Sequence, residues 1–190
     1  MNKKIELTKP IIKFFEMEAA LKVVQDAPGF KFSLLVSMNV DTMTEKLDKI
    51  RKKSEKSEAL EEILKKQEEL RQTFTFDADG KQKTQPVQGQ DGQMVDYPVV
   101  LDNKVDELNV AIVEFWKDEE NDKAKTDYEK QMQEYLELIQ KDEMTFELLT
   151  IPQESVPVEF FEDKENIEIL KPFVKYCREL LEVEVEEVKE

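Results

Sequence analysis

The sequence predicts a mainly α fold with a minor β component, an α+β chain, and three observations lead to this prediction. Apolar residues recur at spacings of three and four over residues 30–72 and again over 103–141, which is the spacing of helices that pack along one side. Residues 73–102, between them, hold two Asp-Gly pairs among β-forming residues, a pattern typical of short hairpins. Residues 1–29 and 142–190 combine strand-like and helical patterns. We therefore expect a long antiparallel helical hairpin with a small β-tip, on a packed base of N- and C-terminal helices and a short two-stranded sheet.

The N-terminal part of the base is expected to be a strand followed by a helix. Residues 3–7 alternate between polar and apolar side chains, which predicts a short strand. Thr8 is then expected to cap a helix over residues 9–25, with Pro10 in its first turn. The sequence Asp-Ala-Pro-Gly over residues 26–29 predicts the turn that ends this helix.

Residues 30–71 and 103–141 are each expected to form one long helix, and the apolar seam of each helix is interrupted in the same way. In the first, the apolar seam becomes polar at Ser54 and Ser57 and resumes one residue out of phase at Leu60. The second becomes polar at Glu119 and Asp122 and also resumes out of phase. Matching interruptions predict one antiparallel pairing, in which these residues meet: Ile50 with Tyr128, Leu60 with Trp116, and Leu70 with Leu108.

The charges near the interruptions support the same pairing. The first segment is basic there and the second is acidic, so attraction between the two is expected to set their register, while the apolar seams hold them together. The basic residues are Lys46, Lys49, Arg51, Lys52, Lys53 and Lys56, and the acidic residues are Asp118, Glu119, Glu120, Asp122, Asp127 and Glu129.

The β-tip is the part of the chain in which we place candidate partner-binding residues. Residues 78–81 predict a tight hairpin turn, and a second Asp-Gly pair follows in a Gln-rich stretch. The sequence Asp-Ala-Asp-Gly over residues 77–80 resembles the start of a calcium loop, but the later acidic ligands are missing, so we favour a plain turn and expect no metal site. The candidate contact residues are Asp79, Gly80, Asp91, Gly92 and Tyr97.

The C-terminal part of the base is expected to contain a strand and a helix. Residues 145–151 predict a strand that pairs with the N-terminal strand. A helix is expected from about Asp163, with Pro172 kinking it or splitting it in two. Residues 182–190 either extend this helix or fray.

Composition limits the classes of function. The formal net charge of −16 argues against nonspecific binding to nucleic-acid phosphates, and it fits an acidic, solvated surface. No run of 18 apolar residues is present, and the first residues lack the apolar core of an export signal. Cys177 is the single cysteine and lies among apolar residues at helical spacing, so we expect a buried thiol in a reducing compartment. These features lead us to expect a cytoplasmic protein that does not contact membrane or nucleic acid directly.

The residue types needed for most enzymatic chemistry are also scarce. The chain has no histidine, and its four glycines do not form a phosphate-binding loop. Carboxylates are abundant, but their number makes any chosen pair uninformative. We therefore expect a protein that is not an enzyme and needs no cofactor.

The layout of the chain resembles a small family of accessory proteins encoded by tailed phages and prophages of Gram-positive bacteria. The resemblance depends on the opening strand at residues 4–7, the turn at Pro28, the two mid-chain Asp-Gly turns, the strand at 145–151, and the closing Leu-Lys-Pro-Phe at 170–173. It implies a phage-encoded protein made in the bacterial cytoplasm, and it brings no catalytic residues to this chain.

These expectations combine into one hypothesis and two alternatives. The hypothesis is an interaction protein that contacts a host or phage protein through the tip or flank of its hairpin. The first alternative is an acidic inhibitor that imitates nucleic acid and binds a host defence protein. The second is a virion or assembly component, for which self-association is expected.

Overall fold

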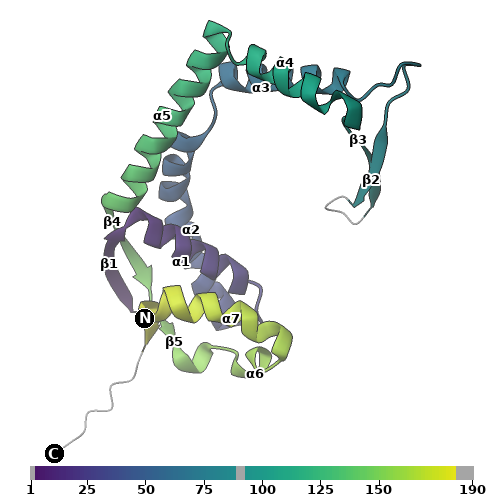
Figure 1. Cartoon of the computed structure of the whole chain (residues 1–190). Coiled ribbons are helices and arrows are strands. Elements are labelled where there is room, and N and C mark those ends of the chain that lie inside the picture. The colour runs from purple at the N-terminus through teal and green to yellow at the C-terminus, as the bar shows by residue number, and fades with distance from the viewer. Residues whose placement is uncertain (1–2, 89–92, 183–190) are drawn as a thin grey trace, which may run out of the picture. The chain divides into compact units, whose positions relative to one another are not determined.

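The computed structural model describes residues 3–88 and 93–182, and these residues are mainly helical with small two-stranded sheets (Figure 1). This confirms the predicted fold class. Contacts divide the chain into two compact units. We call residues 1–54 with 133–190 the base unit, and residues 55–132 the hairpin unit. The division differs from the predicted one, because residues 30–54 and 133–141 belong to the base unit.

The base unit contains the sheet that the sequence predicts. Strand β1 (Lys4–Pro10) pairs antiparallel with β4 (Glu143–Leu149), so that Lys4 lies opposite Leu149 and Pro10 opposite Glu143. Short strands β5 (Ile151–Pro152) and β6 (Leu181–Glu182) pair in parallel. The predicted pairing of the two ends of the chain is thus confirmed.

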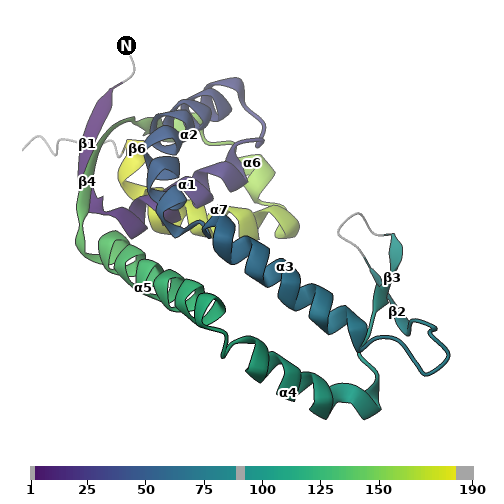
Figure 2. The same cartoon turned by 90° about the horizontal axis from the view of Figure 1, so that it is seen from above.

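Helix α1 lies between two other helices of the base unit, α2 and α7 (Figure 2). Their bounds are α1 Ile11–Val24, α2 Phe30–Arg51 and α7 Lys164–Cys177, and a short helix, α6 (Val158–Phe161), precedes α7. Aromatic rings join these layers, since Phe14 of α1 meets Phe146 of β4 at 4.6 Å between centroids, and Phe32 of α2 meets Phe173 of α7 at 5.7 Å. These buried side chains belong to one continuous core.

One local prediction for the base unit is wrong, and one alternative of a second prediction is wrong. Thr8 does not cap α1, because β1 continues to Pro10 and the Thr8 hydroxyl forms a 2.8 Å hydrogen bond with the hydroxyl of Thr145 across the sheet. Strand pairing uses the residues that a cap would need. Of the two outcomes expected at Pro172, a split is wrong, because α7 runs through Pro172 to Cys177, and a kink stays a prediction. The helix ends there, and residues 183–190 lie outside the described part of the chain.

The prediction of two uninterrupted long helices is also wrong. The first segment forms α2 and then α3 (Glu58–Thr73), and the second forms α4 (Val105–Phe115) and α5 (Glu119–Lys141). Both interruptions are explained by polar side chains that cap helix ends. The Ser57 hydroxyl accepts a hydrogen bond from the Leu60 amide at 3.2 Å, and the Asp118 carboxylate accepts one from the Glu120 amide at 3.0 Å. The change of phase in each apolar seam therefore marks a helix boundary.

Two of the ion pairs near these boundaries join residues of the same helix. Lys49 pairs with Glu45 at 2.7 Å and Lys125 with Glu129 at 3.9 Å, each within its own helix. Arg51 pairs with Glu18 of α1. The expected attraction between the basic and acidic segments, and the expected meeting of Ile50 with Tyr128, stay predictions.

Within the hairpin unit, α3 lies beside α4 and runs antiparallel to it (Figure 2). Among the described residues of this unit, the buried hydrophobic side chains are Leu60, Ile63 and Leu108. The hairpin unit therefore has a far smaller core than the base unit. Across the described ranges 3–88 and 93–182, no helix has the length and apolar character needed to cross a membrane.

Candidate protein-interaction surface

The predicted turn at the tip is present and is built on Asp77. Its carboxylate accepts hydrogen bonds from the amides of Asp79 at 3.0 Å and Lys81 at 2.8 Å. Gly80 has a φ of +74°, which favours glycine. The Asp77 carboxylate is therefore used inside the turn, and Gly80 supplies the positive φ that the turn needs.

A buried threonine joins this turn to α3. The Thr75 hydroxyl donates to the carbonyl of Gln72 at 2.7 Å and accepts from the side-chain amide of Gln82 at 3.1 Å. The Thr75 carbonyl accepts from the amide of Lys83 at 2.8 Å, and the amide of Val99 donates to the Lys83 carbonyl at 2.9 Å. These bonds anchor the following strands to the end of α3.

In the hairpin formed by β2 (Thr84–Gln88) and β3 (Met94–Pro98), every residue except Pro98 is exposed. Val87 lies opposite Val95, and Gln85 opposite Tyr97, so both valines and Tyr97 share one face of the hairpin. Met94 belongs to the other face and is 64% exposed. Asp96 is the one charged residue in either strand. The result is an apolar, nearly uncharged two-stranded surface on an acidic chain.

Among the candidate contact residues, Tyr97 lies on this hairpin. Its ring is half-exposed, and the guanidinium of Arg71 lies 5.9 Å from the ring centroid, which holds the phenol side chain over the end of α3. Asp79 and Gly80 lie in the separate turn described above. Asp91 and Gly92 lie outside the described residues. The sequence analysis did not single out Val87, Met94 and Val95, which lie in a segment almost without charge.

The hairpin unit has two further surfaces with apolar residues. Helix α4 exposes Val110 and Val113, which are three residues apart and so lie on one side of the helix. A groove of about 470 Å³ lies between α3 and the first half of α5. Ile63 and Tyr128 contribute apolar surface to the groove, and charged residues such as Lys66 and Asp127 line it as well.

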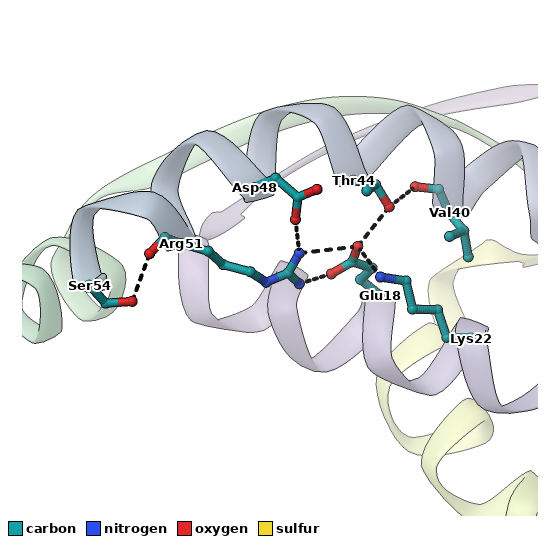
Figure 3. A network of polar contacts seen from close by, with 7 residues as sticks. All are labelled: Glu18, Lys22, Val40, Thr44, Asp48, Arg51 and Ser54. Carbon is teal, nitrogen blue, oxygen red and sulfur yellow. Dashed lines mark hydrogen bonds and ion pairs between the residues drawn. The ribbon is translucent and has the colours of Figure 1, made fainter. Parts of the chain in front are cut away.

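The polar site best defined by its geometry lies in the base unit, around Glu18 (Figure 3). The Glu18 side chain is only 1% exposed, and its carboxylate meets the guanidinium of Arg51, the ammonium of Lys22 at 2.9 Å and the hydroxyl of Thr44 at 2.7 Å. Burial raises the pKa of Glu18, but the hydrogen bonds from Arg51, Lys22 and Thr44 outweigh it and hold the pKa below its usual value. Hydrogen bonds to Glu18 and Asp48 raise the pKa of Arg51.

This network joins α1 to α2, and its charged side chains form ion pairs with one another. Sequence reasoning missed it. The signal was an acidic residue on the apolar side of a helix, one turn after Phe14 and one turn before Leu21.

Cys177 is buried in the base unit, and its thiol approaches the carbonyl of Met17 at 3.6 Å. Burial raises the pKa of this thiol to about 12, so it stays protonated at neutral pH. The prediction of a buried thiol is confirmed.

No protein-family model, curated protein or solved structure matches this chain. The exposed surfaces of the molecule are therefore the evidence on which a function can be proposed.

Proposed function

We propose that this chain is a non-enzymatic protein–protein interaction protein, and that the β2–β3 hairpin binds its partner. The observation that carries the proposal is the exposure of Val87, Val95 and Tyr97 on one uncovered face of that hairpin. A two-stranded hairpin is marginally stable by itself, and its outer edges offer free amide and carbonyl groups to a further strand. A partner that adds a strand would pair with the edge amide and carbonyl groups, and by covering these side chains it would stabilise the hairpin.

The small core of the hairpin unit supports the same proposal. Among the described residues of this unit, three hydrophobic side chains are buried, and their burial offsets little of the entropy lost when residues 55–132 become ordered. A partner that buries the exposed valines of the hairpin and of α4 would add stabilisation. Following the family resemblance, we place this role in a phage-encoded protein that acts in the bacterial cytoplasm on a host or phage protein.

An acidic inhibitor that imitates nucleic acid is the second candidate, and the formal net charge of −16 favours it. The two candidates differ in what holds the complex together. Binding by the hairpin depends on apolar contacts and resists salt, whereas binding of a basic protein by acidic side chains weakens steeply as salt increases.

The test is a capture experiment with the full-length chain and lysate of Gram-positive cells that express it. Val87→Thr with Val95→Thr removes apolar surface from exposed positions while keeping β-branched side chains, so the fold is expected to survive. We expect a specific protein that the unaltered chain captures and that this double variant loses. Val23→Thr, at an exposed position on α1, is the matched control and should retain it.

Equal capture by the double variant would overturn the hairpin proposal. Capture that survives in the double variant but is lost on raising the salt concentration would instead support the acidic inhibitor. Circular dichroism of each variant checks that the fold is unchanged.

A further inference from the structure

Phe30 projects from the base unit with 82% of its surface exposed. It begins α2, directly after Gly29, whose φ of +106° allows the sharp turn there. Leu34 and Met38 follow at spacings of four residues and are also exposed, so the three side chains form one apolar stripe along the outside of α2. We call these three residues the Phe30 stripe. A single exposed apolar residue needs no explanation, but a stripe of three large ones does.

The surroundings of Phe30 are apolar at the centre and acidic at the rim. A hollow of about 450 Å³ lies beside it, lined by Pro28, Gly29, Val156, Pro157, Val158, Glu159 and Phe160. The carboxylates of Glu154 and Glu159 are exposed there, and the ammonium of Lys31 lies 3.4 Å from the Glu154 carboxylate.

Helix α7 carries a surface of the complementary kind. A hollow of about 310 Å³ on its outer side is lined by three apolar side chains, Ile167, Leu170 and Val174, and by Lys171 and Lys175. We call it the α7 hollow. Lys171 also contacts Glu168 of its own helix, and Lys175 lies over the ring of Tyr176. A second hollow shares Lys175 and Tyr176 with this side and is also lined by Lys9, Lys13, Arg178 and Glu179. Lys9 pairs with Glu179 and Lys13 with Glu16, but basic residues outnumber acidic ones in the linings of both hollows.

The two surfaces lie on different elements of the base unit. Helix α1 lies between α2 and α7 (Figure 2), and buried residues of α2 and α7, such as Phe32 and Phe173, belong to the core that these helices share. A molecule therefore presents an apolar projection with an acidic rim on one side and an apolar hollow with a basic rim on another.

We propose that the base unit associates head to tail with a second copy of this chain, with Phe30 of one molecule entering the α7 hollow of the next. In this arrangement Glu154 and Glu159 meet Lys171 and Lys175 of the neighbouring copy. A symmetric contact between two Phe30 stripes would place acidic rims against each other, and a contact between two α7 hollows would do the same with basic rims, so like charges disfavour both. The head-to-tail contact is heterologous and can repeat along a row of molecules.

This association is independent of partner binding by the β2–β3 hairpin, because both of its surfaces lie in the base unit. The contact area is small, so the association is expected to be weak, with a rising average mass between about 10 µM and about 1 mM protein.

The test is sedimentation velocity of the full-length chain over that concentration range. The unaltered chain should gain mass with concentration, and Phe30→Ser should remain monomeric with an unchanged circular dichroism spectrum, since the position is exposed. Val23→Ser, also exposed, is the control and should associate normally. A monomeric unaltered chain at every concentration, or a Phe30→Ser variant that still associates, would overturn the proposal.

Charge reversal tests the pairing of the two rims. Glu154→Lys with Glu159→Lys should abolish association, and so should Lys171→Glu with Lys175→Glu, because each variant places like charges together. An equimolar mixture of the two double variants should associate again, since every mixed contact then joins opposite charges. Failure of the mixture to associate would overturn the head-to-tail arrangement.

One further variant separates this proposal from the function proposed above. Val87→Thr with Val95→Thr should associate as the unaltered chain does. Loss of self-association in that variant would assign it to the hairpin and overturn the role of Phe30.

Discussion

At the scale of single residues, the buried Glu18 carboxylate is the strongest polar link between α1 and α2. Replacing Glu18 with Gln keeps the volume but removes the charge that Arg51, Lys22 and Thr44 surround. Because Arg51 is 38% exposed, water compensates part of the loss. We expect the free energy of unfolding at pH 7 to fall by about 1–3 kcal/mol, measured by urea denaturation.

The pH dependence of this loss follows from the direction of the pKa shift. The pKa of Glu18 in the folded chain is lower than in the unfolded chain, so its contribution is complete above the unfolded pKa and is lost as the pH falls through the folded one. The stabilities of the unaltered chain and Glu18→Gln should therefore differ most at neutral pH and begin to converge as the pH falls below the unfolded pKa of a glutamate, about 4.3. Glu45→Gln, which removes an exposed pair with Lys49, is the control and should leave stability unchanged. A difference that stays constant down to low pH would contradict this assignment.

At the scale of elements, Gly80 decides the conformation of the turn at residues 77–81. A Cβ at this position would meet no atom within 4 Å, so the cost of a side chain comes from the positive φ alone. Gly80→Val should destabilise the hairpin unit by about 1–2 kcal/mol, while Gly80→Asn should cost much less, because asparagine tolerates this conformation. Chemical-shift changes at Asp79 and Lys81, together with thermal unfolding, measure the effect. Equal losses in the two variants would show that φ is not the cause.

The helix interruptions show that the spacing of apolar residues predicts where helices form but not where each helix ends. The spacing of apolar residues predicts helices on both sides of Ser57 and of Asp118, and the structure has helices in both places. A change of phase in the apolar seam is compatible with a polar gap inside one helix. In this chain it marks a boundary at which a serine or an aspartate caps a new helix. A seam that moves by one residue is therefore evidence for a break when a capping residue lies at the same point.

At the scale of the whole molecule, the two units differ in how much they bury. The base unit has a continuous core that includes Phe14, Phe32 and Leu47, while the hairpin unit buries Leu60, Ile63 and Leu108 among its described hydrophobic residues. We expect the amide hydrogens of α3 and α4 to exchange at least tenfold faster than those of α1 and α2 in native-state hydrogen exchange. Equal protection in the two units would contradict this expectation.

Binding provides the control for that measurement. If the hairpin unit is stabilised by a partner, addition of the captured protein should slow exchange in β2, β3 and α4 and leave α1 unchanged. Slower exchange confined to the base unit would assign the binding surface elsewhere.

The sequence by itself determined the elements that follow from local spacing and turn chemistry. The alternation in residues 145–151 predicted β4 and its pairing with β1, the Asp-Gly pair at residues 79 and 80 predicted the tight turn, and the apolar surroundings of Cys177 predicted a buried thiol. Each of these signals depends on residues close together in the chain.

The tertiary structure alone decided which side chains are covered. An apolar side chain is buried only when another element packs over it, so spacing cannot distinguish Val87 and Phe30, which are exposed, from Leu47 and Phe32, which are buried. The contact of Glu18 with Arg51 could not be predicted from the sequence for the same reason. The two residues come from different helices and meet only when α1 packs on α2. The proposed surfaces depend on this coverage, which is a property of the packed molecule.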